Sequence, residues 1–270
     1  MSPPLISVVS PVFKSEDCVE ELCLRLKLAI KPITEDFEII LVEDRGPDDS
    51  WSIIEKETKK DTRIKGIRLA RNFGQHRAIT AGLDIATGDW VVVMDSDLQD
   101  PPEEIPRLYS KACEGFEIVI AEFVERKQSK MRQNLSTFFW NGLSWLSEIP
   151  FDYRVGNYRI MSQKVVANFR SYREQLRLLG GITSLMGFTT TTIPVQRAER
   201  FAGETSYNFS NLLSIAFDIA MAYSSKPLKL SITFGLFVSG LSIIIGAVVL
   251  MFWSTGVIEV PGWASVIVSL

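Results

Sequence analysis

Short, fully apolar runs recur through the first 125 residues, and amphipathic stretches separate them. Runs such as Ile39–Val42 and Val91–Met94 are apolar at every position, which is typical of parallel strands covered on both faces. The pattern predicts strands at Leu5–Val9, Phe37–Val42, Ile64–Leu69, Trp90–Met94 and Phe116–Ala121. It predicts helices at roughly Glu16–Ile30, Asp49–Lys60, Gln75–Ala86 and Pro102–Glu114. This regular alternation predicts an α/β fold with a doubly wound, mostly parallel sheet over residues 1–125.

The pattern changes at Glu125. A basic stretch, Arg126–Arg132, precedes a cluster of large aromatic side chains at Phe138–Trp145. This order is typical of a helix that lies in the headgroup region of a membrane, although a core helix with a charged start is the alternative. A second, mostly apolar helix is expected at Asn208–Ser225. We therefore treat residues 126–228 as a separate region with membrane-interface helices.

One long apolar run follows. Leu230–Trp253 contains 24 residues without a charge, whereas a helix needs about 20 to cross the hydrocarbon core. A buried core helix is rarely uncharged over such a length, so we predict a transmembrane helix at 229–253. A short loop at 254–262 and the start of a second transmembrane helix at 263–270 follow, and we expect the rest of that span to lie beyond residue 270.

Charge is divided between the two halves of the chain. Residues 1–125 contain 15 Lys and Arg against 25 Asp and Glu, whereas residues 126–270 contain 14 against 7. The acidic first half argues against a nucleic-acid partner, because phosphate backbones require basic surface. Lys226 and Lys229 directly precede the apolar run, where the positive-inside rule places cytoplasmic flanks. We therefore expect a cytoplasmic-membrane protein with its N-terminal domain in the cytoplasm. The three cysteines have no metal-site or CxxC spacing and are expected to be reduced.

Polar side chains gather where the predicted strands end. In an open α/β sheet, ligands bind beyond the carboxyl ends of the strands. The residues that follow the first four strands include Pro11, Glu16, Glu43, Asp44, Arg71, Asn72, Phe73 and the stretch Asp95–Pro102. A ligand site is therefore expected at this edge of the sheet.

Asp95 and Asp97 are the strongest local signal. Two carboxylates two residues apart, on a chain that leaves a strand, can turn toward one cation, and Mg²⁺ or Mn²⁺ prefers such oxygen ligands. Gln99 offers a further oxygen or a contact to metal-bound water. The alternative is that these acids cap the helix that begins near Pro102. The acids at neighbouring strand ends favour the metal site.

Several motifs occur together and in a characteristic order. They are Ile6–Phe13 (ISVVSPVF), Val42–Asp44 (VED), Arg71–His76 (RNFGQH), Asp95–Glu103 (DSDLQDPPE), Gly156–Arg159 (GNYR) and Arg200–Tyr207 (RFAGETSY). The chain thereby resembles family 2 glycosyltransferases of the GT-A fold, in the dolichyl/polyprenyl-phosphate sugar synthase branch that includes bactoprenol glucosyltransferase-like proteins. The resemblance covers essentially the whole chain.

The resemblance implies roles for individual residues on the nucleotide side. Pro11 and Glu16 would line the nucleotide pocket, and Asp44 would accept a hydrogen bond from the base. Arg71 would lie near the nucleotide, as a counter-charge or a structural clamp. The metal and the pyrophosphate would be held by Asp95, Asp97 and Gln99, and the single histidine, His76, would shape the pocket wall at a helix start.

Two positions depart from the family pattern. Asn157 stands where relatives often carry an aspartate that is a proposed catalytic base, and Ser206 stands where they often carry lysine. Asn157 is then expected to orient the acceptor or a sugar hydroxyl, with Asp152 as a weaker substitute for the missing acid. The expected contacts to the acceptor phosphate are Arg200, with Arg159 and Arg197 as helpers.

The implied reaction is inverting transfer of a sugar from a nucleotide-diphosphate donor to polyprenyl (undecaprenyl or dolichyl) phosphate in the lipid bilayer. A UDP-sugar is favoured and glucose is the default, while other hexoses, N-acetylhexosamine and a 4-amino-pentose derivative stay open. The resemblance also suggests a homo-oligomer. Two alternatives are a processive polysaccharide synthase, whose Arg-Trp acceptor motif is missing, and a catalytically silent scaffold that binds sugar nucleotides.

Overall fold

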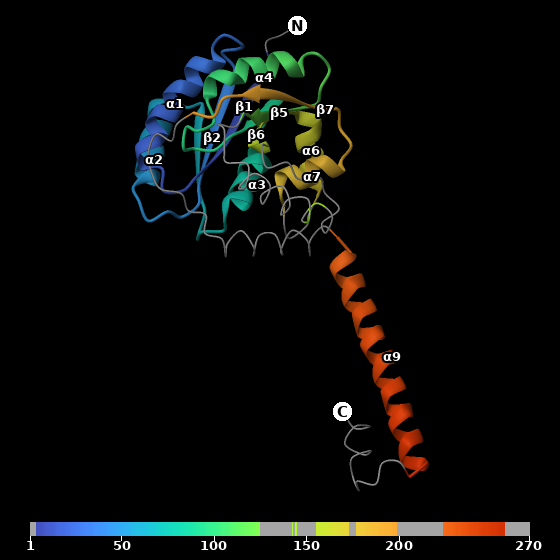
Figure 1. Cartoon of the computed structure of the whole chain (residues 1–270). Helices are drawn as coiled ribbons and strands as arrows, with labels where there is room; N and C mark the ends of the chain where they lie inside the picture. Colours follow the sequence, from blue (N-terminus) through green and yellow to red (C-terminus); the bar gives the residue numbers. More distant parts are fainter. Residues whose placement is uncertain are drawn as a thin grey trace.

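The computed structural model describes residues 4–124, 142, 144, 155–172, 177–198 and 224–256. Its centre is a seven-stranded sheet with the strand order β3-β2-β1-β4-β6-β5-β7 (Figure 1). The strands are β1 Ile6–Val12, β2 Phe37–Glu43, β3 Ile64–Arg68, β4 Trp90–Val93, β5 Ile118–Phe123, β6 Val155–Ser162 and β7 Thr190–Val195. The helices are α1 Glu16–Ile30, α2 Ser50–Lys60, α3 Gln75–Ile85, the short 3-10 helix η1 Pro102–Glu104, α4 Ile105–Ala112, α6 Gln163–Ser171, α7 Leu179–Leu185 and α9 Lys226–Ser254.

The sheet is mostly parallel, as predicted. β1 pairs in parallel with β2 and β4, β2 pairs in parallel with β3, and β5 pairs in parallel with β7. Only β6, among the described strands, is antiparallel to its neighbours β4 and β5. The carboxyl ends of β1 to β4 consequently meet at one edge, and the amino end of β6 lies beside them.

Helices cover both faces of the sheet (Figure 1). α1, α2 and α4 pack on one face, and α3, α6 and α7 pack on the other. Alternate residues of β2 enter the two cores: Ile39 and Leu41 face the first group, whereas Ile40 and Val42 face the second. Burial on both faces explains why these strands have apolar side chains at every position.

The predicted elements of the first half are confirmed with small shifts at their ends. α1 has the predicted bounds, whereas β1 continues to Val12 and so includes Pro11. The helix expected at Pro102–Glu114 consists of η1 followed by α4, which ends at Ala112. The strands β6 and β7 and the helices α6 and α7 were not predicted.

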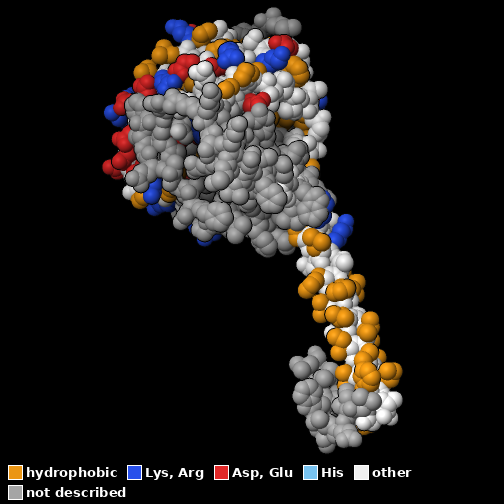
Figure 2. Space-filling view, viewed as in Figure 1, with side chains coloured by type: hydrophobic (Ala, Val, Ile, Leu, Met, Phe, Trp, Pro, Cys, Tyr) orange, Lys and Arg blue, Asp and Glu red, His pale blue; other side chains and the backbone are white. Residues whose placement is uncertain are grey.

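Within the described residues, one helix is long and apolar enough to cross a membrane. This is α9, whose most apolar 18-residue window has a mean hydropathy of 2.4, and no residue of that window is buried. It projects from the α/β domain (Figure 1), and hydrophobic side chains cover its length (Figure 2). The predicted second span at 263–270 lies outside the described residues, as do nearly all of 125–148 and residues 208–223.

Candidate active site at the carboxyl edge of the sheet

The loop after β4 is fixed by its own side chains. The backbone N–H of Asp95 donates to Asp100 Oδ2 at 2.9 Å, and the N–H of Gln99 donates to Asp97 Oδ1 at 3.1 Å. Leu98 lies between these bonds in the left-handed region, with φ +60°, and its side chain is buried. A left-handed leucine is strained, and such strain persists only where the surroundings hold it. Asp95 and Asp97 are therefore presented by a rigid turn.

Three neighbouring segments hydrogen-bond to this loop. The hydroxyl groups of Ser15 and Ser96 share a hydrogen bond of 2.9 Å. The Tyr158 hydroxyl donates to the carbonyl oxygen of Pro101 at 2.8 Å. The N–H of Ala198 donates to the carbonyl oxygen of Gln99 at 3.0 Å. The start of α1, strand β6 and the segment after β7 thus converge on the loop.

The Asp95 carboxylate has two amide neighbours. Gln75 Nε2, at the first residue of α3, donates to Asp95 Oδ1 at 2.6 Å. The Asn157 side chain also hydrogen-bonds to Asp95. The register explains this contact: Val93 of β4 lies opposite Arg159 of the antiparallel β6, so Asp95, two residues after Val93, lies near Asn157, two residues before Arg159.

Negative charge accumulates in the loop. Burial and then the charge of Asp97 raise the pKa of Asp95 to about 6. Burial and then the charge of Asp95 raise the pKa of Asp100 well above its usual range. Among the described residues, no group of three or more His, Cys, Asp or Glu could hold a metal. Asp95 and Asp97 still offer carboxylate oxygens on one loop, and Mg²⁺ or Mn²⁺ can complete its shell there with water and substrate phosphates.

Arg159 is a buried cation on β6. Its Nη2 donates to the carbonyl oxygen of Gly156 at 2.8 Å, its Nε to that of Asn157 at 3.2 Å, and its Nη1 to Thr183 Oγ1 at 3.1 Å. Burial lowers the pKa of Arg159 to about 10, so it stays protonated at neutral pH. It fixes the backbone that carries Asn157, and its charge acts on His76.

Arg197 is a second cation near the loop. Its guanidinium lies 5.1 Å from the centroid of the Phe123 ring, and its charge favours the ionised forms of Asp95 and Asp100. Arg200, the other basic residue predicted to contact the acceptor, lies outside the described residues. Asp152 and Ser206 also lie outside them.

Asp44 directly follows β2 and organises the next part of the site. Its Oδ1 accepts the N–H of Phe73 at 2.7 Å, and its Oδ2 accepts the N–H of Gly74 at 2.8 Å. Gly74 has φ +90°, a conformation that favours glycine. The predicted base-binding residue therefore also sets the loop that leads into α3.

The other predicted nucleotide-side residues lie around this edge. Glu16 Oε2 accepts the N–H of Asp49 at 2.8 Å and so joins the starts of α1 and α2. Pro11 is buried within β1, opposite Val42. Arg71 is exposed, with its guanidinium 4.7 Å from the centroid of the Phe73 ring. The structure thus brings Asp44, Asp95, Asp97, Gln99 and Asn157 to one edge, with Glu16 and Arg71 toward its rim.

His76 follows Gln75 at the start of α3. Burial, and then the charge of Arg159, lowers the pKa of His76 to about 4, so the imidazole is neutral at pH 7. Its Nδ1 is buried without a hydrogen-bond partner among the described residues. A buried, neutral imidazole suits a residue that shapes the pocket wall and does not suit a cationic contact to phosphate.

Two residues that contact Asp95 escaped the sequence analysis. The sequence pattern predicts Gln75 only as a helix start and Asp100 only as part of the acidic stretch. A detectable signal existed for Gln75, because it follows directly on the polar residues after the third strand. No sequence signal distinguished Asp100 from its neighbours.

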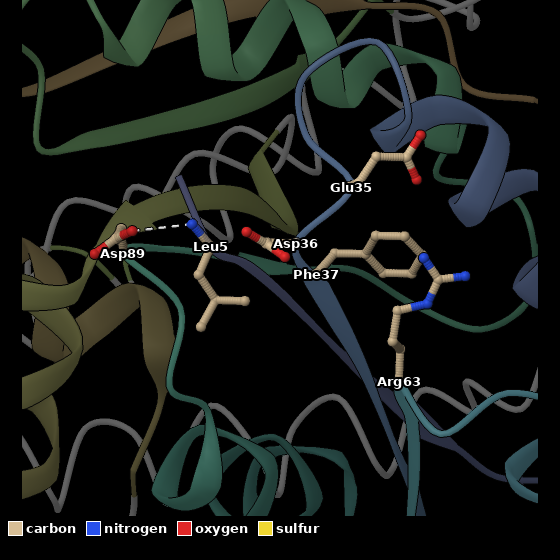
Figure 3. Close-up of a pocket in the computed structure, with 6 residues that line it drawn as sticks. All are labelled: Leu5, Glu35, Asp36, Phe37, Arg63 and Asp89. Atoms are coloured by element: carbon tan, nitrogen blue, oxygen red, sulfur yellow. Dashed lines mark hydrogen bonds between the residues drawn. The ribbon is translucent and has the colours of Figure 1, made fainter. Parts of the chain in front are cut away.

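A separate hollow lies at the opposite edge of the sheet. It has a volume of about 400 Å³ and is lined by Leu5, Glu35, Asp36, Phe37, Arg63 and Asp89 (Figure 3). All six residues lie at or just before the amino ends of strands. The N–H of Leu5 donates to Asp89 Oδ2 at 2.9 Å, and the Arg63 guanidinium lies 4.2 Å from the Phe37 ring centroid. These contacts stabilise the strand starts, far from the edge where ligands bind in such sheets.

Comparisons with known proteins agree with this geometry. The sequence profile of the group described as "Glycosyl transferase family 2" matches residues 7–177. The glycosyltransferase YkcC of Bacillus subtilis is 35% identical over 263 residues, which cover 97% of this chain and 81% of YkcC. The undecaprenyl-phosphate 4-deoxy-4-formamido-L-arabinose transferase of Salmonella choleraesuis is 32% identical over 230 residues, which cover 83% of this chain and 69% of that enzyme.

A solved structure has a similar fold. Glucosyl-3-phosphoglycerate synthase from Mycobacterium tuberculosis, in complex with Mn²⁺, uridine diphosphate and phosphoglyceric acid, superposes with a TM-score of 0.55. The match covers 80% of this chain and 76% of the synthase chain, at 15% sequence identity. At that identity the likeness concerns the fold alone.

Proposed function

The chain belongs to glycosyl transferase family 2, and on that premise we propose that it moves a sugar from a nucleotide diphosphate to a polyprenyl phosphate at a membrane surface. The observation that carries the proposal is the rigid Asp95–Gln99 loop, which lies between the Asp44 side of the sheet edge and the cation Arg197. The 32% identity to an undecaprenyl-phosphate transferase supports the acceptor.

Asp95, Asp97 and Gln99 hold the diphosphate end of the donor through a divalent cation. These residues would hold Mg²⁺ or Mn²⁺, which would supply positive charge to the leaving diphosphate. A synthase of similar fold binds Mn²⁺ together with uridine diphosphate, which supports a divalent cation at this fold in general. Asp44 and Glu16 bind the nucleoside end of the donor. Asp44 accepts a hydrogen bond from the base and also holds the loop before α3.

The reaction needs no protein base. A phosphate monoester has a second pKa near ~6, so the lipid phosphate is largely dianionic at neutral pH. Its oxygen forms a bond to the anomeric carbon while the bond from that carbon to the diphosphate oxygen breaks, and the electron pair leaves with the nucleoside diphosphate. In-line attack inverts the configuration. Arg159, Arg197 and Arg200 supply the positive charge that lets two anions approach each other.

The membrane is the source of the acceptor. α9 is apolar over a length that spans the hydrocarbon core, and Lys226 and Lys229 lie in its first turn, where cytoplasmic flanks are found. The α/β domain therefore faces the cytoplasm, where nucleotide sugars are available. The acidic edge of the sheet receives the donor, and Arg197 and Arg200 are assigned to the lipid phosphate.

The donor is a UDP-sugar, with glucose as the default. The Asp44 carboxylate can accept a hydrogen bond from the imide N–H of uracil. A turnover screen with a panel of UDP- and GDP-sugars, each with Mg²⁺ or Mn²⁺, identifies the nucleotide and the sugar together.

Nucleotide release by the purified chain in detergent tests the function. We expect nucleotide release only when both a divalent cation and undecaprenyl phosphate are present. The lipid product should carry one sugar and no longer chain. Nucleotide release without undecaprenyl phosphate would contradict the assignment of that lipid as the acceptor. Several sugars on one acceptor would indicate a processive synthase, and no release with any donor would indicate a silent binding protein.

A further inference from the structure

Gln75 connects the two ends of the proposed donor site. It is the first residue of α3, it follows directly on Gly74, whose N–H is held by Asp44, and its amide donates to Asp95 at 2.6 Å. A chain of hydrogen bonds thus runs from the end of β2 to the loop after β4.

The backbone before Gln75 has little freedom. Both oxygens of Asp44 are engaged by consecutive N–H groups, at 2.7 and 2.8 Å. The helix that follows is packed tightly on the sheet, because a Cβ on Gly82 would lie 2.4 Å from Val9 Cγ1. The backbone position from which the Gln75 side chain extends is therefore fixed.

The contact is stronger than an ordinary side-chain bond. It joins an amide donor to a carboxylate, and charge-assisted hydrogen bonds are shorter and stronger than neutral ones. The Asp95 backbone is fixed separately, since its N–H donates to Asp100. Together these bonds restrict both the backbone and the carboxylate orientation of Asp95.

We propose that Gln75 is a positioning residue for sugar transfer, which holds the Asp95 carboxylate in the orientation that binds the cation and diphosphate of the donor. This inference rests on the proposed function, because it assigns Asp95 to the donor's metal site. Gln75 itself does not touch the reacting atoms. Partners of metal-binding carboxylates commonly contribute ~10- to 100-fold in metal affinity or activity.

The test measures Mn²⁺ binding to the full chain with UDP, by calorimetry, beside turnover at varied Mn²⁺. For Gln75→Ala and for the isosteric Gln75→Glu we expect metal affinity to fall by about 10- to 100-fold, since each removes the amide donor. We expect excess Mn²⁺ to restore the kcat of Gln75→Ala to within about threefold of wild type. The thermal melting curve of each variant monitors folding, and a purely structural role would not be rescued by metal.

Gln163→Ala is the matched control. Gln163 is also the first residue of a helix, α6, but it lies at the opposite edge of the sheet, where its N–H donates to the carbonyl oxygen of Asp89. We expect wild-type metal affinity from this variant. Equal metal affinity in Gln75→Ala, Gln75→Glu and the wild type would overturn the positioning role. Failure of the wild type to bind Mn²⁺ with UDP would instead overturn the proposed function.

Discussion

Asn157 occupies a position where the family resemblance implies an aspartate that is a proposed base. In this chain its side-chain amide hydrogen-bonds to Asp95, and Arg159 holds its carbonyl oxygen. An amide can stabilise a neighbouring carboxylate, but it cannot take a proton at neutral pH. We infer that residue 157 supports the anionic form of Asp95 and that the lipid phosphate acts without a base.

Asn157→Asp tests this role. The substitution replaces a donor with a carboxylate beside Asp95, and like charges at that distance disfavour ionisation. We expect kcat/KM to fall by about tenfold, the cost of one hydrogen bond to a charged group. Steady-state kinetics at saturating metal is the measurement. Asn168→Asp, on the exposed side of α6, should leave the kinetics unchanged, whereas a rate gain in Asn157→Asp would mean that a base is useful.

His76 gives a stability prediction that depends on pH. The folded state lowers its pKa to about 4 from 6.5, so between these values the unfolded chain binds a proton that the folded chain does not. The stabilisation is complete above pH 6.5 and is lost as the pH falls toward 4. Relative to His76→Gln, we expect the wild type to lose about 2 kcal/mol of unfolding free energy between pH 7 and pH 4.5.

Chemical denaturation of both proteins at a series of pH values measures this difference. His76 is the single histidine of the chain, so no other imidazole contributes. Parallel pH profiles for the wild type and His76→Gln would contradict a buried neutral imidazole.

At the level of residues, the sequence predicted the acids but not their partners. Asp44, Asp95 and Asp97 follow strands whose apolar runs are unmistakable, so their common edge could be inferred. Gln75 and Asn157 reach Asp95 from a helix start and from an antiparallel strand. The Asn157 contact depends on the register between β4 and β6, and the Gln75 contact depends on where α3 packs on the sheet; no local pattern encodes either.

Helix α3 is the element that carries Gln75 and His76, and its approach to the sheet depends on one glycine. A Cβ on Gly82 would lie 2.4 Å from Val9 Cγ1 and 3.1 Å from Val42 Cγ2. Close packing of this kind leaves no room for an added methyl group. The position of the site residues on α3 thus depends on contacts one to two turns away.

Gly82→Ala should therefore destabilise the α/β domain. We expect a loss of about 1–2 kcal/mol, because overpacking outweighs the better helix propensity of alanine. Thermal or denaturant unfolding in detergent measures it. The matched control is Gly240→Ala in α9, where an added Cβ meets nothing within 4 Å. If both substitutions left stability equal or higher, the tight approach of α3 would be disproved.

The unpredicted strands show why element prediction failed in the second half. β6 begins with Val155, Gly156 and Asn157 and contains the buried Arg159, so it lacks the continuous apolar run of a central strand. Its polar residues lie at the candidate site, so their sequence pattern does not match that of a central strand. β7 has exposed threonines, because it is the edge strand of the described sheet.

The whole molecule combines an acidic α/β domain with a basic region and an apolar helix. This division suits an enzyme that takes a soluble donor on one side and a lipid acceptor on the other. No residue of α9 is buried among the described residues, and hydrophobic side chains cover it (Figure 2). Large exposed apolar patches of this kind mark interaction sites for membranes or proteins.

Membrane extraction tests the role of α9. We expect the full chain to stay in the membrane pellet after alkaline washing, since a spanning helix is anchored far more firmly than peripheral contacts. A chain that ends at Ser225 should be released to the supernatant. Release of both chains would contradict a spanning helix, and retention of both would assign the anchor to residues before α9.

The lipid product tests most directly whether the Asp95–Gln99 loop holds a donor whose sugar is transferred to a lipid phosphate. The measurement is mass spectrometry of undecaprenyl phosphate after incubation with the donor and Mn²⁺, beside anomeric NMR of the product. We predict one added sugar of inverted configuration with the wild type, and at least about 100-fold less product with Asp97→Ala, since that residue supports the leaving diphosphate. Full product formation by Asp97→Ala, or retained configuration, would contradict the account.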